Sequence, residues 1–259
     1  MRILITNDDG IHAPGLAVLE RIAQTLSDDL YVVAPENDQS GVAHSLSIND
    51  PLRLRKISSR HFAVKGTPTD CVIMGVRRLF DGVKPDLVLS GVNNGQNVAE
   101  DLTYSGTVAG ALEGASLGLP SIALSQAYGP VGHDEAFWEC AETHAPGVLA
   151  QILGLGIPPG VVINVNFPAC PPEAVQGVAI TAQGRRDAQT VTVEERADGR
   201  GKAYYWISVT RGQNTSVPGT DLAALAQNMI SVTPLKLDMT DEAALARYAD
   251  KLRLSKPVA

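Results

Sequence analysis

Two adjacent carboxylates, Asp8 and Asp9, stand in the segment Asn7-Asp8-Asp9-Gly10, directly after the short apolar run Ile3-Leu4-Ile5. Like charges this close repel, and one carboxyl group would take up a proton unless a positive charge lay between them. The apolar run predicts a buried strand, and ligands bind at the carboxyl ends of strands in a parallel α/β sheet. The segment therefore indicates a bound divalent metal ion and metal-assisted chemistry. The alternative is a structural strand-to-helix turn, with an Asp cap and Gly10 as the hinge.

Three further polar segments follow predicted strands or open a predicted helix. Gln39-Ser40-Gly41 lies in a loop after the second strand, residues 90–97 follow the third, and Ser105-Gly106-Thr107 starts a helix. If the strands are parallel neighbours, all these segments lie on one edge of the sheet and can converge. Each one alone could equally be an ordinary turn or helix cap, because turns and caps use the same residue types.

Together these segments supply hard oxygen donors. Asp8 and Asp9 provide two carboxylates, Ser40 a hydroxyl, and an Asn of the third segment a neutral carbonyl. This set suits Mg²⁺, Mn²⁺ or Ca²⁺ better than a metal that prefers thiolates. A divalent ion held there would lower the pKa of bound water and neutralise charge on a phosphoryl group.

The start of the predicted helix offers a place for the phosphate itself. Ser105-Gly106-Thr107 provides hydroxyls and free backbone N–H groups at a helix N-terminus, which carries partial positive charge. The group that takes the proton of an attacking water is left open between Asp9, His12 and His44, which lie in or beside these loops.

Several other catalytic motifs do not fit these segments. Residues 10–15 and 90–97 do not match the Rossmann fingerprint, and the sequence has no Walker-type phosphate loop. Asp8-Asp9 also lacks the D-x-D spacing of phosphatases that form a phosphoaspartate. The three cysteines, Cys71, Cys140 and Cys170, match no zinc spacing.

The elements that must position these segments alternate between strand and helix over residues 1–165, which is typical of a mostly parallel α/β sheet. We predict strands, each a short run rich in Val, Ile and Leu, over residues 2–6, 30–35, 86–90, 121–125 and 161–166. We predict helices over residues 15–27, from Thr67 onward, over 107–118 and over 134–153.

Two of these helices carry further local signals. Thr67 is predicted as an N-cap, with Pro68 as the first helical residue and Asp70 as the acid of a capping box. Pro146 is expected to kink or interrupt the helix over residues 134–153.

Two parts of the sequence depart from the alternation. Residues 52–55 and 61–64 predict antiparallel strands that leave the main sheet. After residue 176, we predict hairpin strands over residues 178–181, 190–195 and 203–209, with Asp198-Gly199 as a turn. A loop over residues 210–221, a strand over 230–234, and a helix over 241–252 capped by Thr240 follow. We therefore expect an α/β catalytic core over residues 1–175, and a β-hairpin extension and C-terminal arm over 176–259 that belong to the same domain and to an oligomer interface.

The composition limits the class of protein. The chain has 259 residues, 44% of them hydrophobic and 19% charged, which is ordinary for a globular protein with a sizeable core. Its net charge of −7 argues against sequence-independent binding of nucleic-acid polymers, which relies on clustered Lys and Arg. We see no signal peptide and no apolar run of about 18 residues, and the sparse cysteines fit reduced thiols. We therefore expect a cytoplasmic protein with no membrane partner.

Taken together, the segments resemble the stationary-phase survival protein SurE family of metal-dependent 5′/3′-nucleotidases. The matching stretches follow the order and spacing of the family and form a highly specific set. They are residues 5–15, 33–35, 39–41, 66–72, 85–93, 104–108 and 113–114.

The resemblance implies a fold and an assembly. The fold is a three-layer α/β sandwich with a Rossmann-like, mostly parallel sheet, a protruding β-hairpin and a C-terminal arm. The arm would be exchanged between the subunits of a homodimer or homotetramer.

The resemblance also implies a site and a reaction. One divalent ion per subunit, Mg²⁺ or Mn²⁺, would be held by Asp8, Asp9, Ser40 and Asn93. The phosphate would lie near Asn97, Ser105, Gly106 and Thr107. The reaction would be hydrolysis of nucleoside 5′-monophosphates, and in some members 3′-monophosphates, to nucleoside and phosphate.

One late stretch departs from the family pattern. Where the family has Gly-Tyr before Val-Ser-Ile-Thr-Pro, this chain has Asn228-Met229 before Ile230. This change touches the arm, and it leaves nucleotide preference and assembly open.

We therefore predict a divalent-metal-dependent phosphomonoesterase, a 5′-nucleotidase in which a metal-bound water attacks phosphorus and Asp8 and Asp9 are catalytic. The alternative is a non-catalytic module that senses a nucleotide or phosphate at the same helix N-terminus. A metal-dependent glycosyl or nucleotidyl transferase would need a second donor-binding determinant, and we find none in the sequence.

Overall fold

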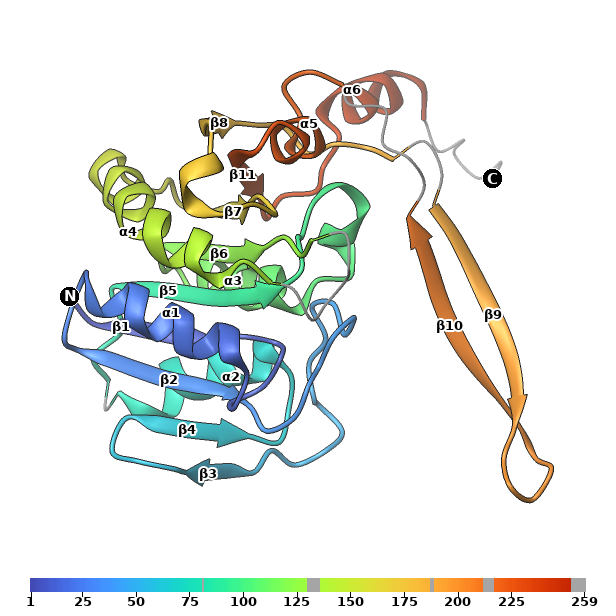
Figure 1. The fold of residues 1–259 in the computed structure, drawn as a ribbon, viewed down its shortest axis with the longest axis horizontal. Coiled ribbons are helices and arrows are strands. Elements are labelled where there is room, and N and C mark those ends of the chain that lie inside the picture. The colour runs from blue at the N-terminus through green and yellow to red at the C-terminus, as the bar shows by residue number, and fades with distance from the viewer. Residues whose placement is uncertain (81, 130–135, 187–188, 212–216, 253–259) are drawn as a thin grey trace, which may run out of the picture.

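The alternating apolar runs form one large sheet. The computed structural model describes residues 1–259 except 81, 130–135, 187–188, 212–216 and 253–259. Within the described residues, nine strands lie in the order β3-β4-β2-β1-β5-β6-β7-β11-β8 (Figure 1). Their bounds are β1 (Ile3–Thr6), β2 (Leu30–Pro35), β3 (Leu54–Lys56), β4 (His61–Val64), β5 (Leu87–Asn94), β6 (Ser121–Gln126), β7 (Val161–Phe167), β8 (Gly177–Ile180) and β11 (Met229–Lys236). The four central pairs that join β2, β1, β5, β6 and β7 are all parallel.

Helices cover both faces of this sheet. Alternate side chains of β1 point to opposite faces, so Ile3 and Ile5 join one hydrophobic core and Leu4 joins another. The first core is covered by α1 (Pro14–Gln24) and α4 (Trp138–Leu155), and the other face by α2 (Pro68–Met74) and α3 (Gly106–Ser116) (Figure 1). The predicted three-layer α/β sandwich with a mostly parallel sheet is therefore confirmed. The other helices of the described residues are η1 (Gly75–Leu79), η2 (Ala99–Thr103), η3 (Pro172–Ala174), α5 (Asp221–Ala226) and α6 (Glu242–Lys251).

Local signals at the helix starts are confirmed for α2. The Thr67 hydroxyl accepts from the Asp70 N–H (3.2 Å), and the Asp70 carboxylate accepts from the Thr67 N–H (2.8 Å), which completes the capping box. Of the two predicted effects of Pro146, the interruption is wrong, because α4 runs through that residue, and the kink stays a prediction. The first residues predicted for this helix, 134 and 135, lie outside the described residues.

The antiparallel strands expected to leave the sheet instead extend it. β4 pairs in parallel with β2, placing His61 opposite Val32, and β3 pairs antiparallel with β4 at the sheet edge. Phe62 and Val64 are buried, so β4 contributes to the core and cannot leave the sheet without exposing them.

A second correction concerns the strand predicted over residues 178–181. This strand, β8, is no part of a hairpin; it pairs in parallel with β11 at the far edge of the main sheet. Its outward-facing Val178 and Ile180 are exposed, as an edge strand allows, and the apolar pattern alone does not reveal a partner about 50 residues away.

The hairpin itself consists of β9 (Gln189–Ala197) and β10 (Ala203–Arg211), and it stands away from the sheet in Figure 1. Asp198 lies at its tip, where its N–H donates to the Lys202 carbonyl (2.9 Å).

Part of the loop predicted over residues 210–221 lies outside the described residues. The helix α5 was not predicted, and α6 is capped by Asp241 rather than Thr240 because the Asp241 carboxylate accepts from the Ala244 N–H (2.7 Å). No helix among the described residues is long and apolar enough to cross a membrane.

Candidate active site

The predicted polar segments meet at the carboxyl-terminal edge of the sheet. They follow β1 and β2, form the end of β5, which extends to Asn94 instead of the predicted Ser90, and open α3; side chains about 100 residues apart in sequence thus come to one place. There they border a cavity of about 760 Å³. The predicted site residues among its lining are Asp8, Ser40, Asn93, Asn97 and Ser105.

The turn that carries the two carboxylates is held by hydrogen bonds on both sides. The Asn7 side-chain amide donates to the Gly10 carbonyl (2.9 Å), and the Gln39 N–H donates to the Asp8 carbonyl (2.8 Å). Gly10 has a φ of +103°, a backbone conformation that other residues rarely adopt. The turn after β1 is therefore fixed against the loop that carries Ser40.

The Asp8 carboxylate is almost fully buried, with 4% of the residue exposed. The Thr107 hydroxyl donates a hydrogen bond to its Oδ1. Burial, and then the negative charge of Asp9, raise the pKa of Asp8 to about 7, although the hydrogen bond from Thr107 acts in the opposite direction. Two carboxylates held in this way form a site that a cation would stabilise.

The two remaining predicted ligands, Ser40 and Asn93, line the same cavity as Asp8. The Asn94 N–H donates to Oδ2 of Asp9 (3.2 Å), and the Asn93 amide nitrogen donates to the Gly95 carbonyl (2.7 Å). Ser40 lies on an exposed part of its loop, and its hydroxyl donates to Asp38 (2.6 Å). The described part of the chain holds no group of three or more His, Cys, Asp or Glu side chains arranged for a metal. Two carboxylates, a hydroxyl and an amide oxygen nevertheless fit a hard divalent cation.

Asn97 is held by two asparagines of β7. Its N–H donates to Oδ1 of Asn166 (2.8 Å), and its carbonyl accepts from the side chains of Asn164 (2.9 Å) and Asn166 (3.0 Å). Its own amide nitrogen donates to the Ser125 hydroxyl (2.9 Å). We did not single out these β7 residues from the sequence, although two buried asparagines in an otherwise apolar strand are a signal that could have revealed them.

The start of α3 divides the predicted phosphate residues into two groups. The Ser105 hydroxyl caps the helix by accepting from the Val108 N–H (3.0 Å), and Ser105 lines the cavity. Gly106 and Thr107 lie behind it, against Asp8: a Cβ on Gly106 would come within 2.8 Å of the Asp8 Cβ. Thr107 therefore contacts the carboxylate, and its hydroxyl is not directed to the cavity as the sequence led us to expect.

Sequence reasoning also missed the outer wall of the cavity. Tyr104 and Tyr128 contribute aromatic surface there, and Val191 and Ile207 contribute apolar surface from the hairpin. No histidine is among the described residues that line it. The His44 side chain instead lies 3.0 Å from the Glu113 carboxylate.

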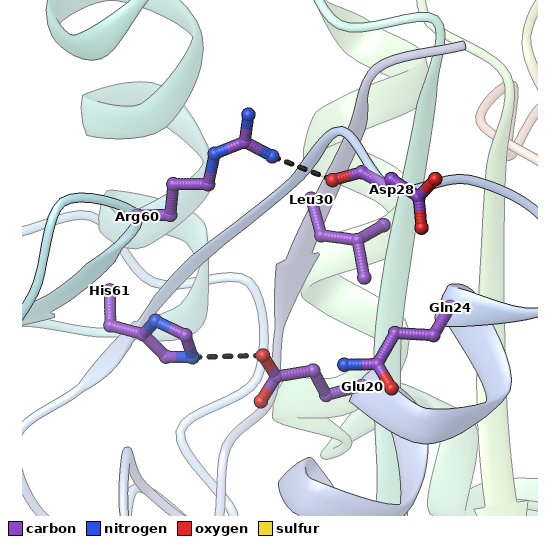
Figure 2. A pocket seen from close by; sticks show the side chains of 6 residues that line it. All are labelled: Glu20, Gln24, Asp28, Leu30, Arg60 and His61. Atoms are coloured by element: carbon purple, nitrogen blue, oxygen red, sulfur yellow. Dashed lines mark hydrogen bonds and ion pairs between the residues drawn. The ribbon is translucent and has the colours of Figure 1, made fainter.

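A second, smaller hollow of about 210 Å³ lies at the opposite edge of the sheet (Figure 2). It borders the first residues of β2 and β4, which are Leu30 and His61. His61 lies 3.0 Å from the Glu20 carboxylate, and Arg60 donates to the Asp28 carbonyl (2.7 Å), as Figure 2 shows. Since its polar groups contact one another and ligands bind at the other end of such sheets, we assign it no function.

Comparison of the whole chain with known proteins identifies its family. The family model described as survival protein SurE matches residues 3–190. The chain belongs to the SurE family. The SurE match includes every residue that we predicted to bind metal or phosphate.

Similar SurE proteins cover nearly the whole chain. A protein of Methylocella silvestris named 5′-nucleotidase SurE is 68% identical over 97% of this chain and 100% of its own length. One of Beijerinckia indica with the same name is 64% identical, over 99% of this chain and 98% of its own. The crystal structure of a SurE protein from Aquifex aeolicus matches with a TM-score of 0.82 and 40% identity, covering 97% of this chain and 100% of that one.

Proposed function

We propose that this SurE-family protein is a metal-dependent 5′-nucleotidase, which hydrolyses nucleoside monophosphates to nucleoside and phosphate. The observation that carries the proposal is Asp8, one of two adjacent carboxylates, which lies against the N-terminus of α3 and lines the same cavity as Ser105. The names of the similar SurE proteins support the class of substrate.

The proposed ligands of one divalent ion per subunit, Mg²⁺ or Mn²⁺, are Asp8, Asp9, Ser40 and Asn93. When bound there, such an ion supplies positive charge for the phosphoryl oxygens and acidifies water. The raised pKa of the buried Asp8 supports this assignment, because burial and the charge of Asp9 both disfavour its negative form, and a cation would offset them.

The chain's own residues would bind and orient the phosphoryl group. The N-terminus of α3, at Ser105 and Gly106, offers the partial positive charge of a helix end, and Asn97 borders the same cavity. Asp8 lines the cavity but is buried and accepts a hydrogen bond from Thr107, whereas the neighbouring Asp9 is partly exposed. Asp9 is therefore our candidate for accepting the water's proton.

The cavity beyond the phosphate suits a nucleoside. Its volume of about 760 Å³ lies within the range of small-molecule sites. Tyr104, Tyr128 and Ile207 give it aromatic and apolar walls, which can pack against a base and sugar. These walls favour a nucleotide over free phosphate as the ligand.

We also propose that residues 176–259, with the hairpin and the C-terminal arm, join subunits into a homodimer or homotetramer. Tyr205 and Trp206 of the hairpin are each more than half exposed, which is costly for side chains of this size unless another surface covers them.

The alternative is a sensor that binds a nucleotide without cleaving it. Against it stands the carboxylate pair, which repels a phosphate unless a cation lies between them. A sensor of phosphate at a helix N-terminus would gain nothing from Asp8 and Asp9.

Phosphate release from nucleoside monophosphates, with and without Mg²⁺ or Mn²⁺, tests the proposal. We expect metal-dependent release that falls on the order of 10²–10³-fold in Asp9→Asn, as when one charge-stabilising group is removed from an active site. Asp28→Asn, at the opposite edge of the sheet, is the matched control and should retain full activity. Tight nucleotide binding without release under any of these metals would favour the sensor.

A further inference from the structure

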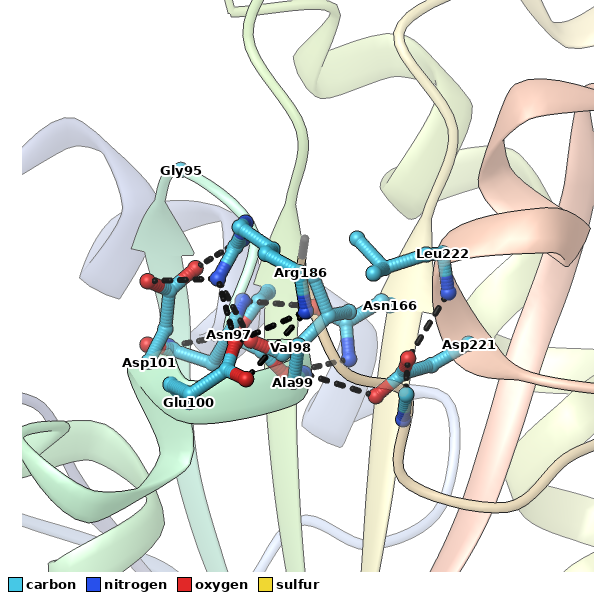
Figure 3. Close-up of polar contacts among 12 residues, drawn as sticks. Gly95, Asn97, Val98, Ala99, Glu100, Asp101, Asn166, Arg186, Asp221 and Leu222 are labelled. Carbon is cyan, nitrogen blue, oxygen red and sulfur yellow. Dashed lines mark hydrogen bonds and ion pairs between the residues drawn. The ribbon is translucent and has the colours of Figure 1, made fainter. Parts of the chain in front are cut away.

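Buried charges outside the proposed metal site hold the loop that carries Asn97. This loop, residues 95–101, runs from the end of β5 into the first residues of η2, and its Val98 and Ala99 are fully buried. Two charged residues from later in the chain, Arg186 and Asp221, reach it from one side (Figure 3). Neither was singled out in the sequence, and neither belongs to the metal or phosphate ligands proposed above.

Arg186 makes a two-point ion pair with the end of the loop. Its NH1 lies 3.1 Å from Oδ1 of Asp101 and its NH2 lies 2.6 Å from Oδ2, with 1% of the arginine side chain exposed. The Arg186 N–H also faces the Glu100 carboxylate at 3.2 Å. Asp101 lines the cavity, so this pair connects the cavity wall to the segment that leads into the hairpin.

Asp221 holds the backbone of the same loop. Its Oδ2 accepts from the Ala99 N–H (2.9 Å), while its Oδ1 accepts from the N–H groups of Gly184 (2.8 Å) and Leu222 (2.7 Å). Ala99 has a φ of +52°, which is uncommon for a residue with a side chain and needs support from its surroundings. The Asp221 carboxylate thus joins this strained position to α5 and to the chain segment just before Arg186.

A need for stability alone does not account for this arrangement. Burying an arginine and two carboxylates costs desolvation energy, and apolar side chains of similar volume often stabilise a protein as well or better. What buried, two-point ion pairs do provide is fixed geometry, since they tolerate little displacement. The geometry fixed here is that of residues 98–101, directly after Asn97.

We propose that Arg186 and Asp221 are positioning residues: they hold the loop of residues 98–101, and through it Asn97, where the phosphate is bound. Arg186 acts through Asp101 and does not touch the substrate, because both of its terminal nitrogens face the carboxylate and its side chain is buried. The link to phosphate rests on the proposed function, whereas the link to the loop does not.

Two measurements on Arg186→Gln and Arg186→Lys test this. Hydrogen exchange of the peptide over residues 95–103 reports the loop, and kcat and KM for a nucleoside monophosphate report the site. We expect faster exchange in this peptide and a loss of about tenfold or more in kcat/KM for Arg186→Gln, mostly in kcat, since small displacements of positioning groups cost that much. Arg186→Lys keeps the charge but loses the two-point contact, so it should recover only part of the loss. Asp221→Asn should speed exchange of the same peptide.

Arg21→Gln is the matched control. It removes the same side chain from another two-point ion pair, with Glu142 (2.7 and 3.0 Å), on the helices that cover one face of the sheet. It should leave loop exchange, kcat and KM as in the unaltered protein.

The proposal is overturned if Arg186→Gln lowers only the melting temperature, with loop exchange and kcat/KM within twofold of the unaltered protein. If Arg186→Gln does not fold, the same comparison with Arg186→Lys and Asp101→Asn decides. If the unaltered protein releases no phosphate, the proposed function fails, and the exchange measurement still decides whether Arg186 holds the loop.

Discussion

The Thr107 hydroxyl donates a hydrogen bond to Oδ1 of Asp8, a residue 99 positions earlier in the chain. Both residues are buried, so this bond joins the first turn of α3 to the end of β1 without access to solvent. The carboxylate and the helix N-terminus therefore form one unit: a displacement of the helix start also displaces the Asp8 side chain.

Thr107→Val should weaken both metal binding and catalysis. The substitution keeps the shape of the side chain but removes the donor, and a hydrogen bond to a charged group contributes about 1.5–3 kcal/mol. The pKa of Asp8 should rise further, because this bond lowers it in the unaltered protein. We expect the Kd for Mn²⁺, measured by calorimetry near neutral pH, to increase about tenfold or more, with a parallel loss of phosphate release. Thr107→Ser restores the donor and should recover most of both; an unchanged Kd in Thr107→Val would contradict this account.

Gly106→Ala should disturb the same unit by steric contact. A Cβ at this position would lie 2.8 Å from the Asp8 Cβ and 2.9 Å from its Oδ2, and both groups are buried. We expect a loss of activity on the order of 10²-fold, the cost of a displacement of about 1 Å in an active site. Gly147→Ala, in α4, is the control: a Cβ there meets nothing within 4 Å, so unfolding should show equal or slightly higher stability. Equal activity of the two variants would argue against close packing at Asp8.

The metal-free protein should lose stability as the pH rises. The pKa of Asp8 is about 7 in the folded protein, against 3.8 for an ordinary aspartate, with burial as the main cause. Between pH 3.8 and about 7, the folded chain keeps a proton on Asp8 that the unfolded chain has released. The stability that this proton contributes is therefore complete below about pH 4 and is lost by about pH 7. We expect Asp8→Asn, unfolded by urea in the presence of a chelator, to show no such loss. Its free energy of unfolding near pH 8 should exceed that of the unaltered protein by a few kcal/mol. Excess Mn²⁺ should narrow the difference, and a constant difference between pH 4 and 8 would contradict the prediction.

Ile207→Ala should affect nucleotides more than small phosphomonoesters. Ile207 borders the cavity from the hairpin although it is largely exposed, which fits a side chain that a ligand covers. If a nucleoside packs there, truncation should raise KM for a nucleoside monophosphate several-fold, in line with about 1–2 kcal/mol of lost apolar contact, and leave KM for p-nitrophenyl phosphate unchanged. Thr192→Ala, an exposed residue on the opposite face of the hairpin, provides the control for general effects on the hairpin. Equal changes for both substrates would place the nucleoside elsewhere.

Local sequence signals predicted the central part of the fold. The apolar run of β1 and the capping box of Thr67 and Asp70 act over a few residues, so their outcome depends little on the rest of the chain. The order of strands and helices also follows, because each parallel connection needs a crossover. The convergence of the polar segments at one sheet edge could therefore be predicted from the sequence.

The strands at the edges of the sheet could not be assigned to it from the sequence. β4 and β8 have the same short apolar pattern as strands of a separate hairpin, and only their partners β2 and β11 place them in the main sheet. Strand pairing between distant segments depends on side-chain packing, which propensity does not encode.

Residue types and local patterns were enough to predict the components of the site and the loops that carry them: two carboxylates after β1, Ser40 after β2, and a helix that opens at Ser105. How these residues are held depends on the tertiary structure. It directed Thr107 to Asp8 and brought Arg186 to Asp101 across 85 positions. The physical reason is that a buried polar group must find a partner somewhere in the folded chain, and chain distance places no limit on where that partner lies.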